Sequence, residues 1–300
     1  MKNIILLILS TFLLIGCGND KKQTQKETKK SFVQQAVFTP QFDTDYIQCG
    51  AGLGPVIDGN SVTFNPGRVV STNGYKNISK IEATIDLSGL NGIEGWNGNF
   101  VNAAFYMVSS AKQPKGDNYC DAGGSAPYCD EIDFLETNGN KIFQQTVHLN
   151  NKQRYEYSFT KAADNECYNW DIMKNDPANG LHSVVDYIDV NSPFDVIINF
   201  ASDYSNVTMT LSQDTGRGDI VVYDMIRDGG AEGSNVLDMS ELAKSMEVGW
   251  WLTPSYWQGY SPKGPGSAPW WTDKCSWDNL CGSNGKWKLS NVKVTAESSF

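Results

Sequence analysis

Histidine and basic residues are both scarce in this 300-residue chain. The two histidines, His148 and His182, are too few for a histidine-rich zinc site. Six of the 24 Lys and Arg residues and two of the 34 Asp and Glu residues lie in the first 30 positions, so residues 31–300 carry a net charge of −14. A surface of this sign repels phosphate backbones and disfavours nucleic acid as a partner. A neutral polysaccharide is compatible with it.

The chain also lacks a long apolar run and a recognisable cofactor motif. The run 4–14 is too short to span a bilayer stably. Gly50 to Gly54 is glycine-rich, but no βαβ unit follows and Pro55 would interrupt the helix that a phosphate loop needs. Nothing marks a nucleophile elbow, although a Ser-His-Asp hydrolase is not excluded. Structural Ca²⁺ would suit a β-sandwich, but no ligand loop is recognisable, so we expect no cofactor.

The N-terminus has the pattern of an export signal. Lys2 precedes the apolar run, which ends in Leu14-Ile15-Gly16-Cys17 and resembles the lipobox of bacterial lipoproteins. The resemblance implies a signal peptide over residues 1–16, acylation of Cys17 and, because Gly18 follows, an anchor in the outer membrane or at the cell surface. An ordinary secretory signal with an incidental cysteine is the alternative. Residues 17–31 then form a lipidated, solvated tether rich in Lys, Gln and Thr.

The cysteine count agrees with export. Seven cysteines are present, and setting Cys17 aside leaves six that fit three disulfides in an oxidising compartment. They are Cys49, Cys120, Cys129, Cys167, Cys275 and Cys281. The sequence leaves all 15 connectivities open. Cys275 and Cys281 are near enough to close a loop, and Cys120 pairs either with Cys129 or with a distant partner.

Residues 32–300 are predicted to form one β-rich domain without a dividing linker. Alternating or apolar segments separated by Gly, Asn, Asp and Pro are typical of strands. They span 81–87, 99–109, 131–137, 141–149, 154–160, 194–201, 206–212, 219–226 and 287–296. Asn138-Gly139 predicts a hairpin, and one helix is expected near 239–246, with Asp238 as its cap and Glu241 three residues on. This pattern favours an all-β sandwich or jelly roll with a minor helix, and we expect a monomer.

The strand 131–137 carries three acids. Side chains alternate along a strand, so Glu131 and Asp133 share a face and Glu136 joins them only if a β-bulge at Phe134-Leu135 adds one residue. Ile132 and either Phe134 or Leu135 would then pack into the core behind the acids. Stacked like charges are costly, which argues for a chemical role. Retaining glycoside hydrolysis needs two carboxyl groups about 5–5.5 Å apart, one ionised and one protonated.

Glu131-Ile132-Asp133-Phe134-Leu135-Glu136 resembles the signature of the clan that unites glycoside hydrolase families 16 and 7, which are concanavalin A-like jelly rolls. The resemblance implies that Glu131 is the nucleophile, Asp133 assists and Glu136 is the acid/base. Cys129 and the stretches 102–109 and 119–122 are similar to family 7, and Gln145-Thr146-Val147-His148 is similar to family 16. Leu135 replaces the Trp usual in family 7, and its long disulfide-rich insertions are absent. An open cleft therefore fits better than a long tunnel.

The residues that would support the acids each have a structural alternative. His148 either tunes Glu136 or hydrogen-bonds the substrate, or it is a half-buried strand histidine. Eight aromatic residues gather between 250 and 277, where four prolines predict an irregular surface stretch between Gly249 and Cys275. Trp257, Trp270 and Trp271, with Trp96 from elsewhere, are the candidate sugar-stacking residues. The alternative is that such side chains pack the core.

These observations predict a retaining endo-β-glycanase, a β-1,3- or β-1,4-glucanase, with polysaccharide as substrate and the membrane reached through the N-terminal lipid. A glycan-binding surface lipoprotein that does not cut its ligand, a lectin or adhesin, is an alternative of another class. A transglycosylase that uses the same acids is a third.

Overall fold

The computed structural model describes residues 34–47, 54–90, 99–122, 127–137, 143–149, 153–158, 188–189, 191–214, 220–224, 239–260 and 285–300. Residues 34–300 form one compact unit. Its strands form an eight-stranded sheet and a ten-stranded sheet, in which every pairing between named strands is antiparallel. The prediction of an all-β sandwich with one minor helix is confirmed for this part of the chain.

The eight-stranded sheet is built on two long central strands, β7 and β17. Its order is β14 (Ile220–Asp224), β13 (Val207–Ser212), β12 (Phe194–Phe200), β7 (Lys80–Asp86), β17 (Trp287–Ala296), β4 (Ser61–Phe64) and β3 (Val56–Asp58), with β1 (Ala36–Phe38) on β17. Buried and part-exposed residues alternate along β7, as the period-two pattern predicts for a strand with one face in the core.

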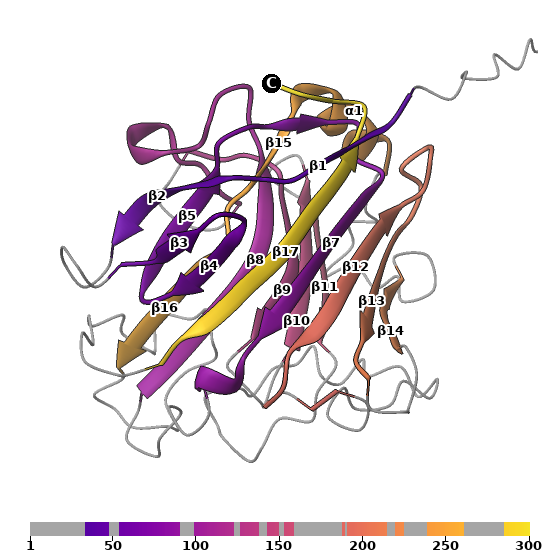
Figure 1. The fold of residues 1–300 in the computed structure, drawn as a ribbon. Helices are drawn as coiled ribbons and strands as arrows, with labels where there is room; N and C mark the ends of the chain where they lie inside the picture. The colour runs from indigo at the N-terminus through magenta and orange to yellow at the C-terminus, as the bar shows by residue number, and fades with distance from the viewer. Residues whose placement is uncertain are drawn as a thin grey trace, which may run out of the picture. The chain divides into compact units, whose positions relative to one another are not determined.

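The ten-stranded sheet lies behind the first in Figure 1. It runs from β11 (Gln153–Ser158) through β10 (Phe143–Leu149), β9 (Glu131–Thr137), β8 (Asn99–Ser109) and β15 (Trp250–Leu252) to β6 (Tyr75–Lys76) and β18 (Ser298–Ser299). A branch leaves β8 through β16 (Ser255–Tyr260), β5 (Gly67–Ser71) and β2 (Phe42–Ile47). Strand β9 is therefore an interior strand, and all seven of its residues are buried.

One apolar cluster joins the two sheets. It includes Ile81 and Ile85 of β7 and Phe105 and Met107 of β8, each at most 1% exposed. The single α-helix of the described residues, α1 (Met239–Val248), adds Leu242 and Met246 to the same core. Short 3₁₀ turns occur at Ser88–Leu90 and Gly116–Asn118. Among the residues that the structure describes, no helix has the length and hydropathy that crossing a membrane requires.

The region after Gly249 departs from the prediction. Trp250–Leu252 and Ser255–Tyr260 are strands on β8 rather than an irregular surface stretch, and Trp250, Trp251 and Tyr256 are at most 5% exposed. Pro254 predicted an irregular stretch, but it lies in the gap between the two strands. Its missing N–H therefore removes no hydrogen bond between strands. Residues 261–284, with Trp270 and Trp271, lie outside the described part of the chain.

Candidate active site

The predicted bulge in β9 is present. Strand β8 pairs Phe105 with Leu135 and Tyr106 with Asp133, so Phe134 is an extra residue on β9. The pairing with β10 shifts at the same place. The bulge leaves the Phe134 carbonyl in the interior, and the buried side chain of Gln145 donates its Nε2–H to that oxygen at 2.9 Å. A local irregularity is thus stabilised by a dedicated hydrogen bond.

The bulge brings the three acids to one face of the sheet. Residues directly opposite on antiparallel strands point the same way. Glu131, Asp133 and Glu136 lie opposite a row on β8 formed by Val108, Tyr106 and Ala104. This row packs as a small cluster of its own, separate from the main core. Ile132, Phe134 and Leu135 all belong to the main core on the other face, so the predicted apolar backing of the acids is confirmed.

Glu131 is held by a backbone amide. Its Oε2 accepts the Ala122 N–H at 2.7 Å, and its side chain shares a hydrogen bond with the Asp133 carboxyl. Burial raises the pKa of Glu131 to about 8, and the nearby carboxylates of Asp121 and Glu136 add to the rise. The two hydrogen bonds act in the opposite direction because they stabilise the ionised form. The buried carboxyl set therefore retains a proton at neutral pH, and its titration belongs to the set rather than to one residue.

Glu136 is oriented by Asn102. The Asn102 Nδ2–H donates to Glu136 Oε1 at 3.0 Å, and both side chains are at most 3% exposed. Because Glu136 Oε1 accepts the amide hydrogen of Asn102, the proton of a neutral Glu136 would sit on Oε2. Asn102 was noted in the sequence only as part of a family-like stretch, and its role as a partner of Glu136 was missed. Its spacing from Glu136 gives no local signal.

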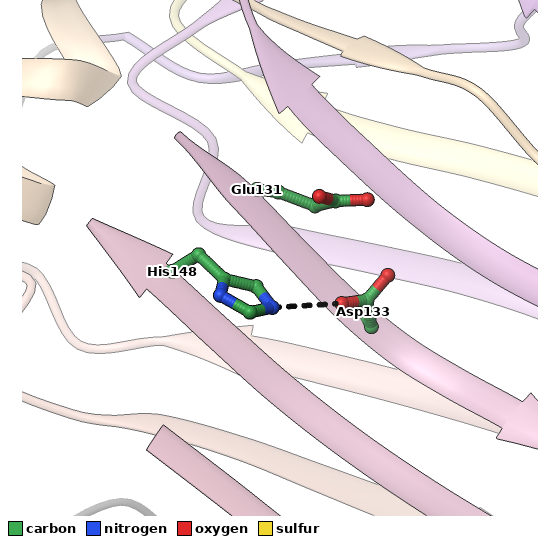
Figure 2. Close-up of side chains that lie close together, drawn as sticks. All are labelled: Glu131, Asp133 and His148. Carbon is green, nitrogen blue, oxygen red and sulfur yellow. Dashed lines mark ion pairs between the residues drawn. The ribbon is translucent and has the colours of Figure 1, made fainter. Parts of the chain in front are cut away.

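Asp133 and His148 lie next to each other on neighbouring strands (Figure 2). The distance from His148 Nε2 to Asp133 Oδ2 is 3.8 Å, and His148 lies directly opposite Glu131. The structure places His148 beside Glu131 and Asp133, whereas the sequence interpretation had offered Glu136 as its partner. One ligand atom from each of Glu131, Asp133 and His148 lies within 4.8 Å of the other two, a set that could hold a metal ion.

An aromatic pair lies on the same face as the acids, and its member Trp257 is two strands away from them. Trp257 of β16 is directly opposite Asn102, and its ring centroid is 5.4 Å from that of Tyr46 on β2. Tyr46 is 41% exposed, so this pair offers an apolar surface that solvent can reach. Of the predicted stacking residues, Trp257 is thus placed on the face of the acids. Trp96, like the two later tryptophans, lies outside the described residues.

One of the expected disulfides is described. Cys120 is bonded to Cys129, which selects the nearer of the two partners considered for Cys120. The bond ties the segment before Ala122 to the residues that lead into β9. Cys17, Cys49, Cys167, Cys275 and Cys281, and with them lipidation and the remaining disulfides, fall outside the described part.

Comparison with known proteins gives likenesses of structure only. No protein-family model matches the chain, and no curated protein does. Among solved structures, an endo-1,3-β-glucanase from Streptomyces sioyaensis aligns with a TM-score of 0.47 and 14% identity, over 85% of this chain and 88% of its own. A family 7 cellobiohydrolase from Daphnia pulex aligns at 0.44 and 14%, over 86% and 91%. The family 16 endo-β-1,3(4)-glucanase SCLam aligns at 0.44 and 10%, over 88% and 90%.

The last two structures are described as members of families 7 and 16, the two families that the acidic strand resembles. The identities are low, so no activity and no residue role is transferred from them. The functional argument depends on the geometry of β9 and its neighbours.

Proposed function

We propose that this domain is a retaining endo-β-glycanase that hydrolyses β-1,3- or β-1,4-linked glucan. The observation that carries the proposal is the bulge in β9, which gathers Glu131, Asp133 and Glu136 on one buried face. A binding protein gains nothing from three buried carboxyls that repel one another, whereas a retaining hydrolase needs a nucleophile and a proton donor close together. This contrast also favours hydrolysis over a lectin or adhesin.

In the proposed reaction Glu131 attacks the anomeric carbon while Glu136 protonates the departing oxygen. Glu136 then removes a proton from water, which releases the glycosyl group from Glu131. The reaction needs one proton shared by Glu131 and Glu136. Because the pKa of Glu131 is raised, the buried carboxyl groups keep a proton at neutral pH. A glycosidic oxygen beside Glu136 would draw that proton to Glu136. The Ala122 N–H and Asp133 favour this redistribution because they stabilise the Glu131 carboxylate.

The substrate class follows from the surroundings. The exposed aromatic surface of Tyr46 and Trp257 suits the apolar face of a sugar ring, and Trp257 lies two strands from β9. Strands are spaced about 4.8 Å apart, so Trp257 is roughly 10 Å from the strand that carries the acids. A glycan chain that crosses the sheet would reach both, which fits an endo-acting enzyme.

The first experiment is incubation with β-glucans, galactans and chitooligosaccharides, followed by product analysis. Short soluble products with the β-configuration at the new end support retaining hydrolysis. Longer products indicate a transglycosylase at the same site, and binding without cleavage by the native protein would support the lectin alternative.

The second experiment assigns the two roles. In Glu131→Ala, azide would replace the nucleophile and give an α-glycosyl azide. In Glu136→Ala, azide would attack the glycosyl-enzyme and give a β-glycosyl azide. The reverse pattern would exchange the roles of the two residues. Circular dichroism of both variants controls for folding.

We also propose that the protein is exported and anchored by lipid on Cys17, with residues 17–31 as a tether. The support is the lipobox-like sequence together with six further cysteines suited to an oxidising compartment. Cys17→Ser should move the protein from the membrane fraction to the soluble fraction and abolish labelling by palmitate. Unchanged fractionation of the variant would contradict the anchor.

A further inference from the structure

We propose that Arg68, which no part of the reaction uses directly, is a positioning residue for Glu131. It acts through the segment 116–122, whose last residue, Ala122, donates its amide to Glu131. The inference depends on the proposed function only for its kinetic consequence, because the position of Glu131 can be measured without a substrate.

Arg68 is anchored before it meets the segment. It lies on β5 with 7% of its surface exposed, and its Nε and Nη2 are 2.7 and 2.6 Å from Oδ2 of Asp45 on β2. Burial alone would lower the pKa of Arg68, but Tyr106, Tyr119 and Asp45 raise it above its ordinary value. Arg68 therefore stays charged, and two of its donors are fixed on one carboxylate oxygen.

The Arg68–Asp45 pair holds the start of the segment 116–122. The other oxygen of Asp45, Oδ1, accepts the Gly116 N–H at 2.7 Å. The guanidinium lies over the ring of Tyr119, with Cζ 3.2 Å from the ring centroid. A cation–π contact stabilises the fold more when it is buried than when it is exposed, because water does not compete for the cation or the ring. The pair thus restrains both Gly116 and Tyr119.

The end of the segment reaches the acids. The Tyr119 hydroxyl is 3.3 Å from that of Tyr106, which lies directly opposite Asp133. Cys120 is bonded to Cys129, and the Ala122 N–H meets Glu131 Oε2 at 2.7 Å. Arg68 fixes one side of this bend and the disulfide fixes the other. Release of Tyr119 should therefore shift the Ala122 amide away from Glu131.

The groups around Glu131 determine what that loss would do. The titratable groups that face it are Asp121, Asp133, Glu136, His148, Tyr106 and Tyr119. The carboxylates of Asp121 and Glu136 oppose its ionisation, and the Ala122 N–H favours it. Without that donor, Glu131 loses the backbone hydrogen bond that holds its Oε2 in place.

The test variant is Asp45→Asn with Arg68→Met, which removes the ion pair as a unit and leaves no lone buried charge. Lys115→Gln is the matched control. It also removes a cation beside this segment, but the ion pair of Lys115 with Asp43 is exposed. The primary measurement is hydrogen exchange of the Ala122 amide by NMR, because that amide donates to Glu131 Oε2. We expect its exchange to become about tenfold faster or more in the double variant and to be unchanged in the control.

Kinetics provide the second measurement once a substrate is known. We expect kcat to fall about tenfold or more with KM within twofold, and the acid limb of the pH profile to move upward. A higher KM with unchanged kcat would make Arg68 a substrate-binding residue and overturn the proposal. Unchanged exchange of the Ala122 amide in a folded double variant would overturn it as well. If the native protein hydrolyses no glycan, the NMR result still decides the positioning role, and only the proposed function fails.

Discussion

Replacement of Glu131 by Gln should make the protein more resistant to a rise in pH. The pKa of Glu131 is raised by burial from its ordinary value of 4.5 to about 8. Between these values the folded protein holds a proton that the unfolded chain has released. Stability from this group is complete below pH 4.5 and is lost as pH rises toward 8. Gln is neutral at every pH, so the variant lacks this loss.

The magnitude follows from the pKa interval. Each pKa unit corresponds to about 1.4 kcal/mol, so the interval from 4.5 to about 8 gives at most about 5 kcal/mol. Water entry on ionisation reduces this, and we expect about 2–4 kcal/mol. At about 2–4 °C per kcal/mol for a domain of this size, the melting temperature of Glu131→Gln relative to native should rise by roughly 4–16 °C between pH 5 and pH 8.

The assay is thermal unfolding of both proteins by calorimetry or circular dichroism at half-unit steps of pH. Contributions from other titrating groups largely cancel in the difference between variant and native. Glu82→Gln on β7 is the control, because the Glu82 side chain is 32% exposed beside Lys80. Its difference from native should be small and the same at both pH values. Parallel melting curves for Glu131→Gln and native from pH 5 to pH 8 would refute the argument that burial opposes ionisation of Glu131.

Three further substitutions test the surroundings of the acids. Asn102→Asp places a carboxyl beside Glu136 and should raise its pKa, which moves the alkaline limb of kcat/KM upward by about one pH unit; an unmoved limb contradicts the contact. Gln145→Leu leaves the Phe134 carbonyl without its donor and should cost about 1–3 kcal/mol in chemical unfolding. Trp257→Ala should raise KM for long oligosaccharides about tenfold or more and leave KM for short aryl glycosides unchanged. Equal loss of activity on both substrates would contradict a role for Trp257 in binding the glycan chain.

Features that depend on local pattern were predictable from the sequence. The bounds 99–109, 131–137 and 287–296 match β8, β9 and β17. In β17 the alternation of apolar and polar residues reports one buried face, whereas β9 is buried on both faces and its C-terminal bound follows from the turn residues after it. The bulge was predictable because only one extra residue returns Glu136 to the face of Glu131. The helix was also predicted, with an end at 246 that the structure extends to Val248.

Features that depend on contacts across the chain were not predictable. Arg68 meets Asp45 only because β5 pairs with β2, and Asn102 meets Glu136 only because β8 pairs with β9. Neither pair has a fixed spacing that a sequence pattern could reveal. The strands before residue 80 are short and were not predicted. The prolines after Gly249 predicted an irregular surface stretch and left its aromatic side chains divided between surface and core, whereas the structure has two strands paired with β8 and buries Trp250 and Trp251.

The same arrangement underlies both the proposed chemistry and its energetic cost. One extra residue in β9 brings Glu136 to the face of Glu131, and Gln145 donates a hydrogen bond to the Phe134 carbonyl at the bulge. The segment that ends at Ala122 supplies one amide to Glu131, which offsets only part of the repulsion among the carboxyls. The site therefore opposes folding at neutral pH, and the core shared by the two sheets must supply the difference. In the proposed reaction, the proton that the carboxyl set keeps at neutral pH is the one that Glu136 gives to the departing oxygen, so the feature that reduces stability is also the one the chemistry requires.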